Sequence, residues 1–392
     1  MPVVAPETSV PATESTATPL AAPVTPEATA EPAARLTPTV VAMRTLEPLV
    51  PTVVAVPQPD PIATLPTDQG AATNENAMVA ALPRHARSRV GVGVPLYVTK
   101  FEFDASLAKQ LGMGWYLDWN IDATPVQLDG LKYAQLYSMR GGNIPLKLDM
   151  IADIAAANPG ALWLAGNEPD VVWQDNQTPE HYAALYHEFY TAVKAADPTA
   201  QVAIAGVSQV TPLRLQYLEA IMAAYEQAYG EPLPVDVWNV HTFILREERG
   251  SWGVGIPPGF DAVDQGILWE ITDHDNLELF RQQIIDFRRW MAKHGQRDKP
   301  LIVTEFGILM PAEYGFPPEQ VAAFMTATFD YLLTATDDQI GYEADANRLV
   351  QRLLWYSLSD SVYPTGNLAD LQTGELTSLG EVFAAYTTKL ED

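Results

Sequence analysis

Short apolar runs recur along the chain from Val90 onward, and each is followed by a longer polar or amphipathic segment. A parallel sheet buried on both faces produces this pattern, because its strands are apolar throughout and the helices between them carry one polar face. Eight such runs are present, the number of strands in a closed barrel of alternating strands and helices. We therefore predict an α/β fold, a (β/α)8 TIM barrel, with strands at 90–94, 113–117, 133–137, 161–165, 201–206, 235–240, 301–304 and 353–357.

Several of the intervening segments have recognisable helix starts. Thr178 can cap a first turn, and Pro179 fits the first helical position after it. The run Asp273-His274-Asp275 is interpreted as the cap of a helix that begins near residue 277, because contiguous loop residues rarely converge on one metal ion. Further helices are predicted at 101–111, at 277–293 and from Pro317 onward. The helix after Pro179 carries one apolar face at helical spacing, formed by Tyr182, Leu185, Tyr186, Phe189 and Val193.

The first 88 residues differ in composition from the rest. They contain no aromatic residue, one glycine and 15 of the 32 prolines, among many threonines and alanines. Such a segment cannot build an ordinary core, so we predict a disordered Pro/Thr/Ala-rich linker or stalk at 1–88, followed by one catalytic domain at 89–392. The alternative is that the apolar stretch 39–56 forms one strand or docks on the barrel. Arg44, Glu47 and Pro48 interrupt that stretch, so it does not read as a membrane span.

The charge balance narrows the possible partners. A formal charge of −26 disfavours nucleic acid and anionic lipid, which normally bind basic patches, whereas a neutral carbohydrate is an easier partner. No charged start followed by an apolar stretch opens the sequence, so no secretory signal is visible. A Pro/Thr-rich spacer is nevertheless typical of enzymes held outside the cell. We therefore expect an extracellular or cell-surface location, and we expect a monomer.

Two glutamates directly follow predicted strands. Glu168 comes after the fourth strand, in Gly166-Asn-Glu-Pro-Asp170, and Glu305 comes after the seventh, in Val303-Thr-Glu-Phe-Gly307. The carboxyl ends of barrel strands meet at the face that carries the chemistry in such enzymes. Hydrolysis of a glycosidic bond needs two carboxyl groups there, one to protonate the leaving oxygen and one to attack or to activate water.

These two motifs resemble the acid/base and nucleophile signature of retaining clan A glycoside hydrolases. Within that clan, Trp115-Tyr-Leu-Asp-Trp119 and Gly166-Asn-Glu-Pro-Asp170 are similar to the glycosyl-hydrolase catalytic-core group, which includes the family 128 endo-β-1,3-glucanases. The likeness is dense between about residues 113 and 190 and again near 305. It implies a retaining, endo-acting hydrolase of a β-linked polysaccharide of the β-glucan type, working without a cofactor.

The resemblance also implies roles for single residues. Glu168 would be the acid/base and Glu305 the nucleophile. Asn167 would hydrogen-bond the sugar 2-hydroxyl, an interaction that strengthens in the transition state. His241 would face the nucleophile side, and Trp355 would be a stacking platform for the apolar face of a pyranose ring.

Two more residues complete the expected substrate-binding set, Trp119 and Asp170. Phe243 stands where clan members often carry a tyrosine, which leaves the partner that orients Glu305 unassigned. The loop after the sixth strand, about 244–272, is long, and long loops in compact domains usually have a function. We expect the sixth and eighth loops to set specificity through Trp252, Tyr363 and Asn367.

Other kinds of chemistry have no motif support. Gly91-Val-Gly93 lacks the third glycine of a dinucleotide site, and no Gly-x-Ser-x-Gly elbow occurs. We therefore predict no metal and no cofactor. Two alternatives to the β-glucan hydrolase stay open. One is a non-catalytic barrel that binds cell-wall glycan, and the other is a hydrolase of xylan or mannan type, or one with exo action.

Overall fold

The computed structural model describes residues 85–95, 105–126, 130–142 and 147–390. The predicted linker at 1–88 therefore lies outside the described residues except for 85–88, and so does the start of the predicted helix at 101–111. Among the described residues, no helix combines the length and the apolar character that crossing a bilayer requires.

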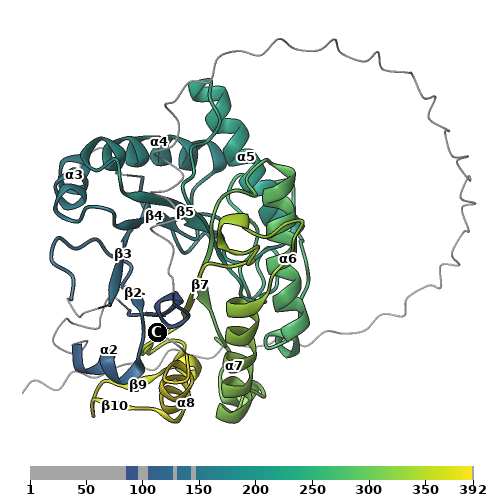
Figure 1. The fold of residues 1–392 in the computed structure, drawn as a ribbon. Coiled ribbons are helices and arrows are strands. Elements are labelled where there is room, and N and C mark those ends of the chain that lie inside the picture. Colours follow the sequence, from purple (N-terminus) through teal and green to yellow (C-terminus); the bar gives the residue numbers. More distant parts are fainter. Residues whose placement is uncertain (1–84, 96–104, 127–129, 143–146, 391–392) are drawn as a thin grey trace, which may run out of the picture. The chain divides into compact units, whose positions relative to one another are not determined.

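The described part of the chain contains eight parallel strands arranged in a barrel, as predicted (Figure 1). Their order in the sheet is β5-β4-β3-β2-β1-β8-β7-β6. The two end strands, β5 and β6, meet through isolated parallel bridges, Ala203 with Val237 and Val207 with Val240, and these bridges close the circle. The strands are β1 Val90–Gly93, β2 Trp115–Leu117, β3 Lys132–Tyr137, β4 Leu162–Asn167, β5 Gln201–Gly206, β6 Trp238–His241, β7 Leu301–Phe306 and β8 Arg352–Trp355.

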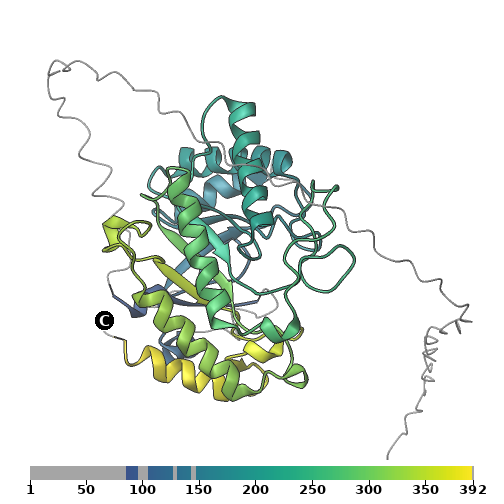
Figure 2. The ribbon, with the colours of Figure 1, turned by 90° about the vertical axis from the view of Figure 1, so that its right-hand side faces the viewer.

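Helices cover the outside of the barrel and alternate with the strands, except that the described residues between β2 and β3 contain no helix (Figures 1 and 2). They are α2 Ala105–Leu111, α3 Leu148–Ala157, α4 Pro179–Ala196, α5 Pro212–Tyr229, α6 Leu277–Lys293, α7 Pro318–Thr334 and α8 Ser378–Thr387. A short antiparallel pair, β9 Ala369–Asp370 with β10 Glu375–Leu376, precedes α8. The 3-10 turns are η1 Arg87–Arg89, η3 Ile271–Asp273, η4 Ala312–Tyr314, η5 Glu343–Asp345 and η6 Pro364–Gly366.

The helix starts follow from local capping chemistry. The Thr178 hydroxyl accepts a hydrogen bond from the backbone of His181 at the start of α4, as the sequence predicts. Thr211 caps α5 in the same way, again with a proline at the first helical position. The cap of α6 is Asn276, and not the run Asp273–Asp275 that we predicted, because the side-chain oxygen of Asn276 accepts from the N–H groups of Glu278 and Leu279.

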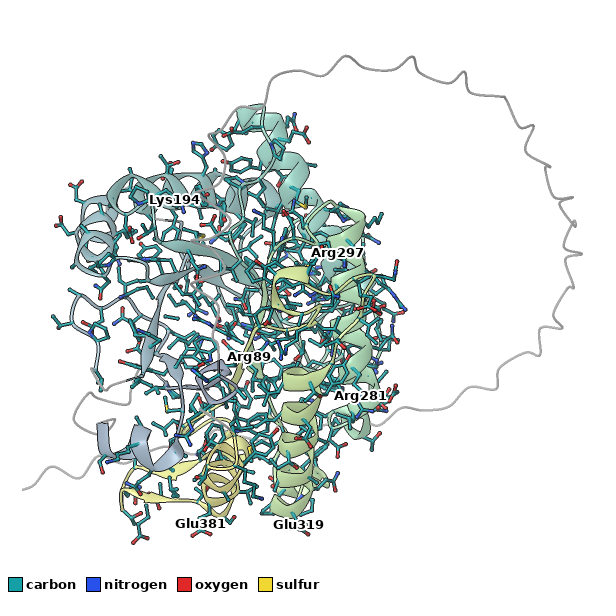
Figure 3. All side chains as sticks on the ribbon, viewed as in Figure 1. Arg89, Lys194, Arg281, Arg297, Glu319 and Glu381 are labelled. Carbon is teal, nitrogen blue, oxygen red and sulfur yellow. The ribbon has the colours of Figure 1, made fainter. Side chains whose placement is uncertain are left out.

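Strand alternation divides the core into two layers. Inward-pointing side chains fill the barrel itself, among them Leu164, Ile302 and Leu354. Their outward-pointing neighbours pack against the helices in a larger layer. Figure 3 shows charged side chains such as Glu319 and Glu381 extending from the helices into solvent, so the outer surface of the helices is polar. The apolar packing thus leaves the carboxyl ends of the strands as the place for polar side chains.

Candidate active site

Glu168 lies in the turn that leaves β4. Its backbone has a positive φ of 41°, an unusual conformation for a residue with a side chain. The turn is held by a hydrogen bond from the N–H of Glu168 to the carbonyl of Gly206, 3.1 Å, and by one from the N–H of Val171 to the carbonyl of Glu168, 3.1 Å. The resulting side chain is buried but lines a cavity at the barrel mouth.

Glu305 reaches the same cavity because of an irregularity in β7. Ile302 points into the barrel, so regular alternation would point residue 305 outward. The register with β6 shifts at this point, however, pairing Val240 with Val303 and then His241 with Glu305. This bulge adds one residue to β7 and reverses the alternation, after which Phe306 packs in the outer layer.

His241, the last residue of β6, lies between the two glutamates. Its Nδ1 is 2.8 Å from Oε1 of Glu168, and its Nε2 is 3.6 Å from Oε1 of Glu305. Each residue offers one polar atom, and the three atoms lie within 4.8 Å of one another. Among the described residues, this trio is also the group that could coordinate a metal ion. The structure thus brings together the two predicted carboxyls and the predicted histidine.

Trp119 supplies the partner of Glu305 that the sequence left unassigned. Its indole Nε1 donates to Oε1 of Glu305 over 2.8 Å. The backbone of Trp119 has a φ of 55°, and its ring packs edge-on against Tyr356. Phe243 lines the cavity beside the carboxyls. A tryptophan from the loop after β2 therefore makes the contact expected of a tyrosine after β6, and only the folded barrel brings these loops together.

Burial and mutual charge set the electrostatics of the trio. Burial raises the pKa of the Glu305 carboxyl to about 7; the positive charge on His241 opposes this shift, and the negative charge on Glu168 adds to it. Burial would lower the pKa of His241, but the carboxylates of Glu305 and Glu168 outweigh it and raise that pKa above its usual value. The three groups are close enough to bind protons as a unit.

The cavity above the carboxyls has a volume of about 430 Å³ and an aromatic rim. Four of the eight exposed large apolar side chains on the described surface lie on this rim: Trp173, Tyr314, Val362 and Tyr363. An exposed apolar cluster on a soluble protein marks a binding surface. Trp252 and Val254 of the long sixth loop form part of the cavity wall, and Tyr363 of the eighth loop lies on its rim. Both loops therefore lie where they could shape specificity, as predicted. Asn367 instead bonds to the backbone of Asp360.

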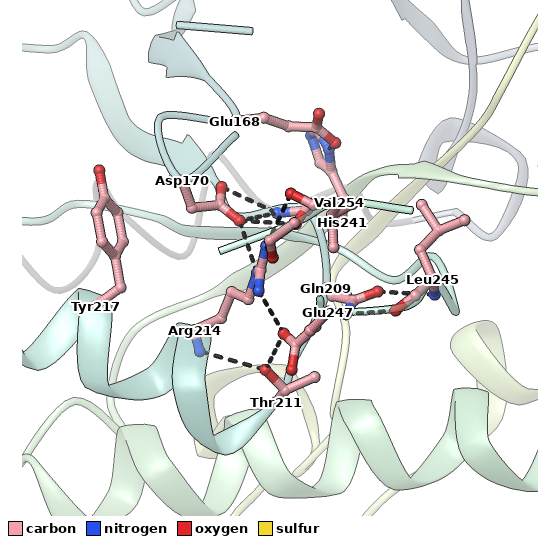
Figure 4. A network of polar contacts seen from close by, with 12 residues as sticks. Glu168, Asp170, Gln209, Thr211, Arg214, Tyr217, His241, Leu245, Glu247 and Val254 are labelled. Atoms are coloured by element: carbon pink, nitrogen blue, oxygen red, sulfur yellow. Dashed lines mark hydrogen bonds and ion pairs between the residues drawn. The ribbon is translucent and has the colours of Figure 1, made fainter. Parts of the chain in front are cut away.

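Asn167 and Asp170 flank Glu168 but have different surroundings. The backbone N–H of Asn167 donates to Asp175, and its side-chain oxygen is buried with no protein partner among the described residues. Asp170 is fully buried beneath the cavity, where it accepts from Ser208 and forms an ion pair with Arg214 (Figure 4). Asp170 therefore does not contact the cavity, in contrast to our prediction that it binds substrate.

Trp355 is not a stacking platform in this structure. Its side chain is fully buried, its indole donates to the carbonyl of Gly366, and its ring packs edge-on against Phe306 and Phe329. Leu354 points into the barrel, so Trp355 must point toward the helices and the next residue, Tyr356, toward the cavity. The predicted position was one residue away from the aromatic side chain that lines the site.

His274 connects the sixth and seventh loops below the cavity. Its Nδ1 bonds to the carbonyl of Ile244, and its Nε2 accepts from the N–H of Leu309, each over 2.9 Å. These two bonds define a neutral ring with its proton on Nδ1. Burial lowers the pKa of His274 to about 4, which agrees with a neutral structural role.

Comparison with known proteins places the fold. No protein-family model matches the sequence, and no curated protein matches it. Among solved structures, a family 128 subgroup II endo-β-1,3-glucanase from Sorangium cellulosum matches with 18% identity and a TM-score of 0.50, over 76% of this chain and 98% of that chain. A subgroup I endo-β-1,3-glucanase from Amycolatopsis mediterranei in complex with laminaritriose has 16% identity and a TM-score of 0.51, over 76% and 99%.

A third similar structure is a subgroup III curdlan-specific exo-β-1,3-glucanase from Blastomyces gilchristii in complex with glucose. It has 18% identity and a TM-score of 0.50, over 77% of this chain and 99% of that chain. The matches span nearly the full length of those chains. The chain therefore has the fold of family 128 glycoside hydrolases, as the sequence resemblance implied.

Proposed function

We propose that the protein is a retaining glycoside hydrolase that cleaves a β-linked glucan within the chain. The observation that carries this proposal is the pair of buried glutamates after β4 and in β7, with a carboxylate oxygen of each within 4.8 Å of the other. Retaining enzymes hold their two carboxyl groups about 5–5.5 Å apart, whereas inverting enzymes leave about 6.5–9.5 Å for a water molecule. The bound of 4.8 Å on one oxygen of each carboxyl fits the closer arrangement, and on it we rest the proposal of a covalent intermediate.

The roles follow from this geometry. Glu305, oriented by the indole of Trp119, attacks the anomeric carbon and forms a glycosyl ester, while Glu168 protonates the leaving oxygen. Glu168 then takes a proton from water, which displaces the ester and frees Glu305. His241 contacts both carboxyls, so its imidazole can stabilise negative charge on either one as the charge moves from Glu305 to Glu168.

The cavity favours a neutral sugar chain. Its aromatic rim offers flat apolar surfaces to pyranose rings, and the unpaired side-chain oxygen of Asn167 can accept from a sugar hydroxyl. One of the similar structures holds laminaritriose, a β-1,3-linked sugar, which makes β-1,3-glucan the first substrate to test. Because such polymers occur outside cells, we further propose an extracellular or cell-surface enzyme, acting as a monomer.

The test is release of reducing ends from β-1,3-glucan, mixed-linkage glucan, xylan and mannan, with and without a chelator. We expect activity on a β-glucan that resists the chelator and disappears in both Glu168→Gln and Glu305→Gln. Proton NMR of the first product should show the β-anomer before mutarotation. An α-anomer would indicate inversion, and single glucose units from the start would indicate exo action.

Two results would change the assignment itself. Activity on xylan or mannan alone would keep the hydrolase and change its sugar. No activity on any polymer, together with retained binding to one of them, would favour the glycan-binding barrel. Both glutamates line the cavity, and this supports the proposal of an active enzyme over a barrel with a displaced carboxylate.

A further inference from the structure

Arg214, in the first turn of α5, is a fully buried cation with partners in two loops (Figure 4). Its Nε is 3.1 Å from the carboxylate of Asp170, and its Nη1 is 2.6 Å from that of Glu247. Its Nη2 donates to the backbone carbonyls of Val254 and Gly255. The planar guanidinium suits this task, because its fixed fork of donors can engage several acceptors at once.

These partners belong to loops that build the candidate active site. Asp170 lies two residues after Glu168, in the turn that aims that side chain. Glu247 and Val254 belong to the sixth loop, and Val254 lines the cavity. Arg214 therefore joins the loop that carries the predicted acid/base to the sixth loop, which forms part of the cavity wall.

The turn at Glu168 needs such support. A side chain at positive φ persists only where the surrounding structure holds it in place. Asp170 anchors this turn to the loop after β5, because its carboxylate also accepts from the N–H and the hydroxyl of Ser208. Without Arg214, that carboxylate would be a buried charge without its counter-ion, a condition that proteins relieve by protonation or by rearrangement.

We propose that Arg214 is a positioning residue for Glu168, acting through Asp170. The inference rests on the proposed function, since it assigns Glu168 the acid/base role. Loss of a positioning residue should impair proton transfer by Glu168 far more than attack by Glu305. Loss of a residue that merely stabilises the fold should impair both steps alike.

The test compares Arg214→Met with Arg288→Met. Arg288 is a matched control, since it is also fully buried, but it bonds to Leu349, Lys299 and Gln351, which precede β7 and β8 at the opposite end of the barrel. Folding of each variant is checked by circular dichroism. If Arg214→Met does not fold, Arg214→Lys replaces it, because lysine keeps the charge but cannot span both carboxylates.

Two substrates separate the roles of the glutamates. Cleavage of β-glucan needs the acid, whereas a dinitrophenyl β-glycoside has a leaving group that departs without protonation, and azide releases the glycosyl ester without a base. We expect Arg214→Met to lower kcat on β-glucan by about 100-fold or more. On the activated glycoside with azide, we expect a loss of less than about 10-fold. An equal loss on both substrates, or an equal loss in Arg288→Met, would overturn the proposal.

A second readout needs no activity, so failure of the proposed function would not hide the answer. The ring N–H of His241 bonded to Glu168 should give a downfield proton NMR signal, assigned by its loss in His241→Gln. We expect this signal to move or broaden in Arg214→Met and to stay unchanged in Arg288→Met. An unchanged signal in a folded Arg214→Met variant would show that Glu168 is held without Arg214.

Discussion

At the scale of single residues, the candidate active site depends on where backbone irregularities point the side chains. The bulge in β7 turns Glu305 into the cavity, and positive φ angles occur at Glu168 and at Trp119. Such conformations cost roughly 1–3 kcal/mol each, and they cluster where function requires them. Glu168, Glu305 and Trp119 thus occupy backbone positions that ordinary strands would not provide, whereas His241 is an ordinary strand residue of β6.

The indole of Trp119 is expected to support the charge of Glu305. Trp119→Phe keeps an aromatic ring but removes the 2.8 Å bond, which favours the ionised carboxylate. A hydrogen bond to a charged group is worth about 1.5–3 kcal/mol, so kcat/KM should fall by about 10- to 100-fold. The loss should be larger below pH 7, because without this bond the pKa of Glu305 rises further. Steady-state kinetics across pH measures both effects.

Trp163→Phe is the control for this variant. Trp163 is fully buried in β4, and its indole nitrogen has no hydrogen-bond partner among the described residues. The substitution therefore removes the same volume without removing such a bond. If the two variants lose activity equally, packing and not the bond to Glu305 explains the result.

The sequence predicted which strand ends carry the site but not the details of side-chain direction. Asn-Glu-Pro after one apolar run and Thr-Glu-Phe-Gly after another were sufficient to find Glu168 and Glu305. We predicted Trp355 and not Tyr356 as the aromatic residue of the cavity. The sequence of β8 does not show that Leu354 packs inward, and this packing turns Trp355 away from the cavity. Asp170 was wrongly predicted to bind substrate, because its true partner, Arg214, lies 44 residues away along the chain. No local pattern reveals such a contact.

At the scale of elements, the cavity is held by contacts between loops. His274 is the clearest example, because its two ring nitrogens link the sixth loop to the seventh. Leu309, its partner in the seventh loop, lines the cavity. A neutral imidazole can both donate and accept in this way, whereas a protonated ring has only donors.

The stability of the protein should therefore fall as His274 is driven to bind a proton. Its pKa is about 4 in the folded protein, against about 6.5 unfolded, so the unfolded chain binds more protons between these values. The contribution of His274 is fully present above about pH 6.5 and is lost progressively as the pH falls toward 4, by up to about 3 kcal/mol. Urea unfolding at pH 7 and pH 5 measures this loss.

His274→Gln provides the comparison. Glutamine can replace part of the bonding but does not titrate, so this variant should be less stable than wild type at pH 7 and should lose less on going to pH 5. A difference between the two proteins that is the same at both pH values would contradict the prediction. Other titrating groups, including His241, contribute equally to both proteins and cancel in the comparison.

Elements with strong local signals were predictable. Apolar runs identified all eight strands, and the Thr-Pro start identified α4 to the residue. The cap of α6 was assigned to the run Asp273–Asp275 instead of to the next residue, Asn276, since both Asp and Asn can cap a helix and only the turn geometry distinguishes them. The bulge in β7 has no sequence signal of its own, because the extra residue is defined by its pairing with β6.

At the scale of the whole barrel, the strand pairings are unequal. Most neighbouring strands form continuous ladders, whereas β5 and β6 join through isolated bridges. Two of the hydrogen bonds there, from Ile204 to Val237 and from Val237 to Val202, have N···O distances of 3.3 Å. We predict that the amide hydrogens of Ile204 and Val237 exchange with deuterium faster than those within the β3–β4 ladder, measured residue by residue by NMR. Equal protection at both places would contradict this.

The irregular pairing of β5 with β6 has a consequence for motion at the site. The backbone N–H of His241 donates to Val207 across this joint, while its ring contacts Glu168. Each time the joint opens, the imidazole would be free to leave the carboxyl, and the proton shared between them would exchange with solvent. The lifetime of the contact between His241 and Glu168 would then depend on how often the barrel opens between these two strands.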